Sequence, residues 1–195
     1  MKNELDWWHL FRLGDEAAFK LLFEHYSPLL FNYGYKFTQE EGLIEDSIQE
    51  FFLKIWYNRD SINDTASVKN YLYKAFRRTL TAHIERSNRK RNIPVESLPF
   101  DIELPHDTKI MRRERLEEIK TQLEEALLKM TARQREVIHL RFFEELSYEE
   151  IADIMGLSVK DLYKLFYRAM DSLRKHVAVF NLLAIFALLA ESKSS

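Results

Sequence analysis

The 195-residue sequence contains no cysteine and only four glycines and four prolines. Without cysteine the chain forms neither disulfides nor thiolate metal sites. Its six histidines never stand three or four positions apart, the spacing that would place two metal ligands on one face of a helix, so no metal site is expected. The first residues include early acidic side chains and no apolar segment of signal-peptide length, and we therefore expect a cytoplasmic protein.

The chain also lacks an excess of basic charge. Its 29 Lys and Arg against 31 Asp and Glu give a formal net charge of -2, whereas proteins that hold bare DNA by displacing counterions are usually basic. Hydrophobic residues make up 46% and charged residues 31%, a balance that builds a core and keeps the protein soluble. We therefore expect a globular protein for which any role on DNA requires a helper.

Apolar residues recur at three- and four-residue spacing, as at Ile48, Phe51, Phe52 and Ile55, and no segment alternates convincingly like a strand. This period predicts an all-α protein. Helix starts are indicated by capping boxes at Thr38–Glu41, Thr131–Gln134, Ser147–Glu150 and Ser158–Asp161, and by Ser27–Pro28, where proline would take the first helical position.

Three of the four prolines, Pro94, Pro99 and Pro105, lie in one short polar stretch that predicts a linker. We expect two small helical domains, over residues 1–90 and 112–176, joined by a linker over 91–111. An apolar tail, residues 177–195, follows. Its fourteen mainly apolar residues, 177–190, are fewer than the roughly 20 that span a bilayer, so they either cover a core surface or dock on another protein.

Residues 148–167 have the spacing of a helix-turn-helix. Its fifth position, where the two helices cross closely, is Ala152, and its ninth, where the turn needs a positive φ, is Gly156. The second helix then presents side chains that we predict to contact DNA: Ser158, Lys160, Asp161, Tyr163, Lys164, Tyr167 and Arg168. The alternative is an ordinary helical hairpin with a solvated face. Residues 116–176 hold ten Lys and Arg against twelve Asp and Glu, which predicts weak unaided affinity for DNA.

Residues 77–91 are the most basic segment, with six Lys and Arg against one acid. Tyr57, Tyr71, Tyr73 and Phe76 lie nearby in the sequence and offer faces on which unpaired bases could stack. The predicted contacts to a melted DNA strand are Tyr71, Arg77, Arg78, Arg86 and Arg89. The alternative is that the aromatic residues belong to the core and the charges form a solvated face.

Residues 45–56 carry an acidic face. Asp46 and Glu50 stand one helical turn apart with Gln49 beside them, a like-charged pair that an isolated helix disfavours. The pair indicates either a basic partner or a solvated acidic edge.

Together these features resemble the extracytoplasmic-function group of sigma factors, in the sigma-70 family of bacterial RNA polymerase, over nearly the whole chain up to His176. The family's GD-x-x-AF opening is represented by Gly14, Asp15, Ala18 and Phe19. Its D-x-x-QE-x-F-L-x-x-W stretch stands here as Asp46, Gln49, Glu50, Phe52, Leu53 and Trp56. Its fourth-region pattern is found at Gln134 to Val137, Leu146 to Ala152, Gly156, Arg168, Ala169, Leu173 and Arg174.

The resemblance implies that residues 1–90 are sigma region 2 and residues 112–176 are sigma region 4. It implies that Asp46, Gln49, Glu50 and Leu53 bind the clamp helices of core RNA polymerase. The basic segment with Tyr71 would then bind the minus-ten element of promoter DNA, and the helix-turn-helix the minus-thirty-five element. An anti-sigma factor is the further partner implied, and neither a cofactor nor catalysis is expected.

The sequence departs from the family pattern at two places. Many relatives carry R-N…D…R in the helix that reads the minus-ten element, where this chain has Arg77–Arg78, Ala82 and Glu85. In the reading helix, Asp161 and Leu165 replace the commoner Thr and Arg. The nearest alternative function is a free-standing helix-turn-helix regulator that binds duplex operator DNA as a dimer without polymerase.

Overall fold

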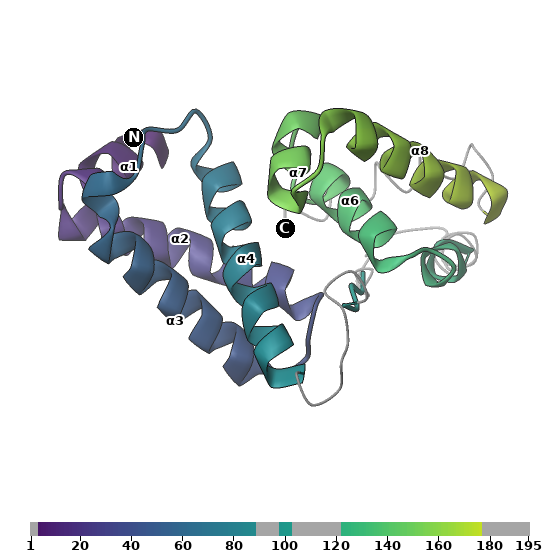
Figure 1. Cartoon of the computed structure of the whole chain (residues 1–195), viewed down its shortest axis with the longest axis horizontal. Coiled ribbons are helices and arrows are strands. Elements are labelled where there is room, and N and C mark those ends of the chain that lie inside the picture. The colour runs from purple at the N-terminus through teal and green to yellow at the C-terminus, as the bar shows by residue number, and fades with distance from the viewer. Residues whose placement is uncertain (1–3, 89–97, 103–121, 177–195) are drawn as a thin grey trace, which may run out of the picture. The chain divides into compact units, whose positions relative to one another are not determined.

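The computed structural model describes residues 4–88, 98–102 and 122–176 (Figure 1). The regular elements in these ranges are all helical, which confirms the predicted all-α fold. They are α1 (Glu4–Arg12), α2 (Glu16–Tyr35), α3 (Glu41–Tyr57), the 3₁₀ turn η1 (Arg59–Ser61), α4 (Val68–Asn88), a helical segment over residues 122–128, α6 (Ala132–Phe142), α7 (Tyr148–Met155) and α8 (Val159–His176). None of the helices in these ranges is long and apolar enough to cross a membrane.

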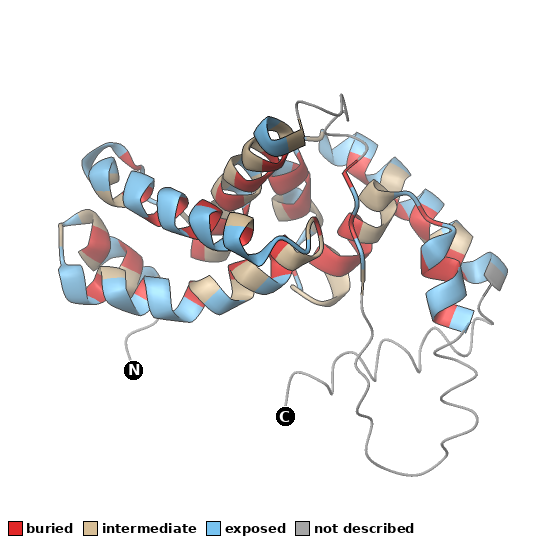
Figure 2. Ribbon diagram, turned by 90° about the horizontal axis from the view of Figure 1, so that it is seen from below, coloured by how far each residue is buried: buried red, intermediate tan, exposed pale blue. Residues whose placement is uncertain are grey.

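The chain divides into two compact units, a first that ends at Pro99 and a second that begins at Phe100, with residues 153–155 grouped with the first. Within each unit the buried residues lie on the helix faces that turn toward neighbouring helices (Figure 2). The apolar tail, residues 177–195, lies outside the described residues, and so does the predicted linker apart from residues 98–102.

A tight corner joins α1 to α2. Gly14 has a φ of 88°, a conformation open mainly to glycine, and the Asp15 carboxylate accepts the backbone N–H of Ala18 at 2.9 Å, which caps α2. Ala18 is 3% exposed, and the Phe19 ring lies 4.8 Å from the Trp56 ring. The GD-x-x-AF segment therefore supplies a turn, a cap and two packing residues.

Two predicted helix starts are wrong. Pro28 lies inside α2 rather than at a start, because residues on both sides of it, such as Leu22 and Leu30, are buried in one core, and their burial offsets the hydrogen bond that proline removes. The box expected at Thr38–Glu41 is not formed. Thr38 Oγ1 instead accepts the N–H of Glu40 at 3.2 Å, and α3 begins without a side-chain cap.

The crossing of α2 with α3 and α4 requires a glycine. A Cβ on Gly34 would lie 2.8 Å from Cγ2 of Ile44 and 3.3 Å from Cζ of Phe76. Fully buried Tyr33 and Tyr73 pack beside this point with their ring centres 5.1 Å apart. Only a residue without a side chain lets these helices approach so closely.

We expect Gly34→Ala to lower the free energy of unfolding of the first unit by about 1–3 kcal/mol, because the added methyl overpacks a closed core. Gly42→Ala on α3 is the control: its methyl would have no neighbour within 4 Å, and it should stabilise the unit by about 0.5–1 kcal/mol through helix propensity. Denaturant titration followed by tryptophan fluorescence measures both, since Trp7, Trp8 and Trp56 all lie in this unit. Equal effects would contradict the account of the crossing.

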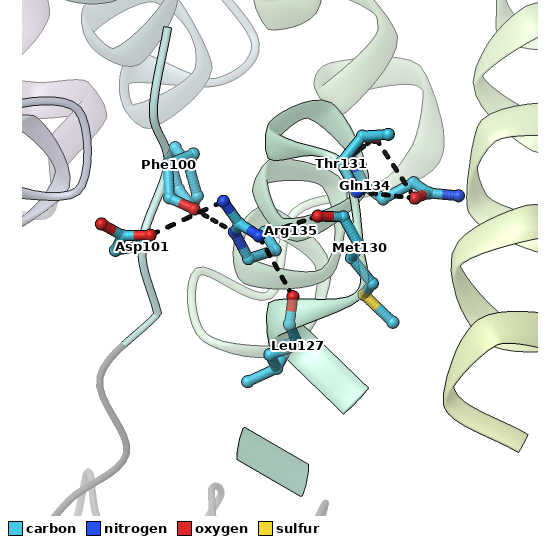
Figure 3. Close-up of polar contacts among 7 residues, drawn as sticks. All are labelled: Phe100, Asp101, Leu127, Met130, Thr131, Gln134 and Arg135. Carbon is cyan, nitrogen blue, oxygen red and sulfur yellow. Dashed lines mark hydrogen bonds and ion pairs between the residues drawn. The ribbon is translucent and has the colours of Figure 1, made fainter. Parts of the chain in front are cut away.

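In the second unit, Arg135 of α6 holds three backbone segments together (Figure 3). Its guanidinium donates to the carbonyl oxygens of Leu127 at 3.1 Å and Met130 at 2.8 Å, and to that of Phe100. The Asp101 carboxylate lies 3.6 Å away. The Arg135 side chain is only 15% exposed, so one largely buried cation bonds to carbonyl oxygens at the end of the helical segment 122–128 and just beyond it. Residues 100 and 101, part of the predicted linker, are thereby held on the second unit.

Arg135→Ala should destabilise the second unit by about 2–4 kcal/mol, because it removes hydrogen bonds that a largely buried, charged donor makes to three carbonyl groups. Arg133→Ala removes the same charge from the same helix and should change stability by less than about 0.5 kcal/mol, as most surface substitutions do. Amide hydrogen exchange in α6 and α8 reports this unit directly. Comparable loss of protection in the two variants would show that charge, not the carbonyl contacts, matters.

Candidate functional site

Asp46, Gln49, Glu50 and Leu53 form one exposed stripe on α3, called here the α3 stripe. Their spacing of three, four and seven residues places them on one side of the helix. Leu53 is 54% exposed, and Tyr57, one turn further, is 76% exposed. The structure therefore brings all four predicted side chains together.

The stripe is tied to α4 through Glu50. Its Oε2 lies 2.8 Å from Nε2 of His83, and Nδ1 of the same ring lies 2.9 Å from Oγ of Ser47. Sequence reasoning missed His83, since no spacing marks it and its contacts arise only when α3 packs on α4.

On α4 the predicted DNA-binding residues divide into two groups. At about 100° per residue, Tyr71, Arg78 and Arg86 lie within roughly 80° of one another on one side; Arg78 and Arg86 are exposed, and Tyr71 is half-buried. The Tyr71 ring lies 4.8 Å from the Trp8 ring, and burial raises the pKa of its phenol. Arg77 faces another side, with its guanidinium 6.0 Å from the centre of the Phe37 ring. Arg89 lies outside the described residues.

Tyr73 and Phe76 do not offer faces for unpaired bases. Both are fully buried, and their rings lie 5.1 and 6.5 Å from that of Tyr33 in the core. The hypothesis that they stack on DNA is wrong, since the apolar face of α4 is needed to close the first unit. Tyr57, in contrast, is well exposed.

The helix-turn-helix has the predicted geometry. Ser147 and Glu150 form a capping box at the start of α7. The N–H of Glu150 donates to Oγ of Ser147 at 3.2 Å, and the N–H of Ser147 donates to the Glu150 carboxylate at 2.9 Å. Gly156 has a φ of 64°, and the N–H of Leu157 donates to the carbonyl of Ala152 at 2.8 Å. This is the turn that ends a helix on a left-handed glycine.

All the residues predicted to read DNA are exposed at the start and along α8, but three of them bond to one another. Ser158 Oγ accepts the N–H of Asp161 at 3.1 Å and donates its hydrogen to Oδ2 of Asp161 at 2.7 Å, while Lys164 Nζ donates to Oδ1 at 2.9 Å. These bonds from Ser158 and Lys164 lower the pKa of Asp161. Asp161 thus supports the cap of α8 and restrains Lys164.

The aromatic surroundings of α8 include a residue that sequence reasoning missed. The Tyr148 ring lies 4.8 Å from that of Tyr163, and the Arg141 guanidinium lies 5.1 Å from the centre of the Tyr148 ring. In the sequence Tyr148 marks only the first position of the motif, although an aromatic residue there can pack on the second helix.

Comparison with known proteins places both units. Residues 22–90 match the family described as Sigma-70 region 2, and residues 120–173 match that described as Sigma-70, region 4. Two relatives are from Bacillus subtilis. RNA polymerase sigma factor SigV is 27% identical over 143 residues, 73% of this chain and 79% of SigV, and ECF RNA polymerase sigma factor SigW is 23% identical over 175 residues, 84% and 91% of the two chains.

A solved structure shows the same fold. The sigma factor RpoE from Bartonella quintana, crystallised with the anti-sigma factor NepR, matches with a TM-score of 0.58 at 20% sequence identity, over 83% of this chain and 97% of that chain. CnrH, solved in complex with the cytosolic domain of CnrY, also has a TM-score of 0.58, at 21% identity.

A helical unit with an exposed acidic stripe, followed by a unit with a helix-turn-helix, defines a class of DNA-binding transcription factors. The two matches lie in the order region 2, region 4 and span α3, α4 and α6–α8. The chain belongs to the sigma-70 family, in its extracytoplasmic-function group. Proteins of this family are non-enzymatic transcription initiation factors. The match to region 2 decides against a free-standing regulator, which would leave the first unit without a role.

We expect Asp161→Ala to tighten sequence-independent binding to duplex DNA several-fold at low salt, because it removes a negative charge and releases the Lys164 ammonium. The slope of log K against log salt should steepen by about one unit. Asp171→Ala is the matched control: it also releases a lysine on α8, Lys175, paired at 2.8 Å, outside the predicted reading residues. Fluorescence anisotropy with a labelled duplex measures both slopes. An equal change in both variants would contradict a role specific to Lys164.

Proposed function

We propose that this sigma factor directs RNA polymerase to specific promoters by binding the core enzyme through the α3 stripe and promoter DNA through α4 and α8. The observation that carries the proposal is the exposure of all four stripe residues on the face of α3 opposite its buried residues. They stand in the segment that resembles the polymerase-binding stretch of sigma region 2.

The α3 stripe combines the chemistry of a protein interface. Asp46 and Glu50 supply negative charge for a basic partner, Gln49 supplies a hydrogen-bonding amide, and Leu53 offers an exposed apolar anchor. Such an apolar contact surrounded by polar groups is typical of the centre of a binding surface.

The proposed DNA contacts come from one helix of each unit. On α4, Arg78 and Arg86 attract phosphates of the minus-ten element, and Tyr71 lies on the same side. Two further arginines are predicted to contact this element: Arg77, which faces a different side of α4, and Arg89, which lies outside the described residues.

The contacts of α8 to the minus-thirty-five element come from two groups of residues. Those along the exposed face are Lys160, Tyr163, Tyr167 and Arg168, and those at the cap are Ser158, Asp161 and Lys164. Each well-formed base contact contributes on the order of 1–3 kcal/mol of discrimination.

Neither DNA contact needs to be strong alone. The chain has a formal net charge of -2, so its general attraction for phosphate is small. When polymerase holds both units, the second contact forms at high effective concentration and the two weak contacts act as one. In this scheme the chain itself catalyses nothing and works in the cytoplasm, where polymerase acts. Within the described residues no group of three or more His, Asp or Glu side chains is placed to hold a metal ion.

An anti-sigma factor is the second proposed partner. RpoE was solved with the anti-sigma factor NepR, and this chain shares its fold and belongs to the same family. A partner that covers the α3 stripe or the reading face of α8 would exclude polymerase or DNA. The proposed docking role of the apolar tail concerns residues outside those that the structure describes.

Asp46→Arg and Glu50→Arg should each weaken binding to purified core RNA polymerase by about tenfold or more, since a favourable charge pair becomes a repulsive one. Glu24→Arg makes the same charge reversal on α2, at a carboxylate that is also exposed, and should leave the affinity nearly unchanged. Anisotropy of a fluorophore-labelled chain titrated with core enzyme measures all three. No binding by the wild-type chain, with dimeric binding to duplex DNA instead, would overturn the proposed function.

A further inference from the structure

Ser47, His83 and Glu50 form a hydrogen-bonded chain beneath the α3 stripe. The Ser47 side chain is buried between α3 and α4, and its hydroxyl donates to the backbone carbonyl of Leu43 at 2.6 Å. The His83 ring contacts Ser47 Oγ through Nδ1 at 2.9 Å and the Glu50 carboxylate through Nε2 at 2.8 Å. The His83 side chain is 16% exposed, whereas that of Glu50 is 52% exposed.

The directions of these bonds follow from the hydrogens available. An ionised Glu50 carboxylate can only accept, so Nε2 of His83 donates to it, and this bond is charge-assisted. With a hydrogen on Nε2, Nδ1 of a neutral ring accepts from the Ser47 hydroxyl, whereas Nδ1 of a ring with both hydrogens donates to Ser47 Oγ. Ser47 fixes the plane of the ring, and the ring aims its Nε2–H at Glu50.

This arrangement restrains a side chain that would otherwise move freely. An exposed glutamate samples several rotamers, and a partner that requires one of them pays the entropy of ordering it. His83 holds Oε2 of Glu50 in place before any partner binds, while the carboxylate keeps acceptor capacity for that partner. Since His83 lies on α4, the same bond also connects the stripe to the helix that carries Arg78 and Arg86.

We propose that His83 is a positioning residue for polymerase binding, which holds Glu50 of the α3 stripe in the orientation that the core enzyme meets. The proposal rests on the proposed function of the stripe. The proposal gives each ring nitrogen a different role: the bond between Nδ1 and Ser47 orients the ring, and the bond between Nε2 and Glu50 positions the carboxylate.

Two substitutions of His83 divide these roles. In His83→Gln the side-chain amide reaches the position of Nε2 and can still donate to Glu50, whereas in His83→Asn the shorter amide reaches only the position of Nδ1 and Ser47. We expect His83→Gln to bind core RNA polymerase within about twofold of wild type and His83→Asn about three- to tenfold more weakly, the range that one restrained side chain contributes. In a Glu50→Ala background neither substitution should weaken binding further.

Controls separate positioning from a general loss of structure. Denaturant titration followed by tryptophan fluorescence shows whether the two variants differ in stability. At equal stability, an affinity for core polymerase that is kept in His83→Gln and lost in His83→Asn is not expected if His83 only stabilises the fold. Wild-type affinity in His83→Asn, while Asp46→Arg still weakens binding, would overturn the positioning role and leave the stripe's function intact. If the wild-type chain does not bind core polymerase at all, the proposed function fails and this inference fails with it.

Discussion

The structure of the first unit depends on the burial of one face of α3. Ile48, Phe51 and Ile55 pack inward toward α2 and α4, and the close approach at Gly34 lets all three helices share one core. Because the helix has 3.6 residues per turn, the burial of this face leaves the α3 stripe exposed on the opposite side and places Ser47 against His83. A single packing constraint thus sets both the exposed surface and the hydrogen-bonded chain that supports it.

The second unit reaches its functional surface by other means. The capping box at Ser147, the left-handed Gly156 and the Ser158 cap fix where α7 ends and α8 begins, and Arg135 ties the preceding backbone to α6. Local hydrogen bonds therefore decide how α8 is presented. In both units the polar residues proposed to bind partners lie on helices that the apolar core already holds in place, so binding need not order the backbone.

Several features were predictable because their causes are local. The apolar spacing predicted helices throughout, and the caps at Thr131, Ser147 and Ser158 are confirmed. The prediction that a helix starts at Pro28 is wrong because the buried residues before and after it belong to one core, which keeps α2 continuous. The prediction that Tyr73 and Phe76 offer faces to DNA is wrong because both residues close that core. In each failure, tertiary burial outweighed a local preference.

The sequence by itself determined the helical class, the helix-turn-helix with its glycine turn, and which residues of α3 and α8 are exposed. These follow from spacing within one helix, where neighbouring residues have a fixed geometry. Only the tertiary structure decided that His83 bonds to Glu50, that Arg135 binds the carbonyl of Phe100, and that the Arg77 guanidinium lies over the Phe37 ring. Those contacts join residues more than thirty positions apart, and no local pattern specifies which distant side chain a packed helix will meet.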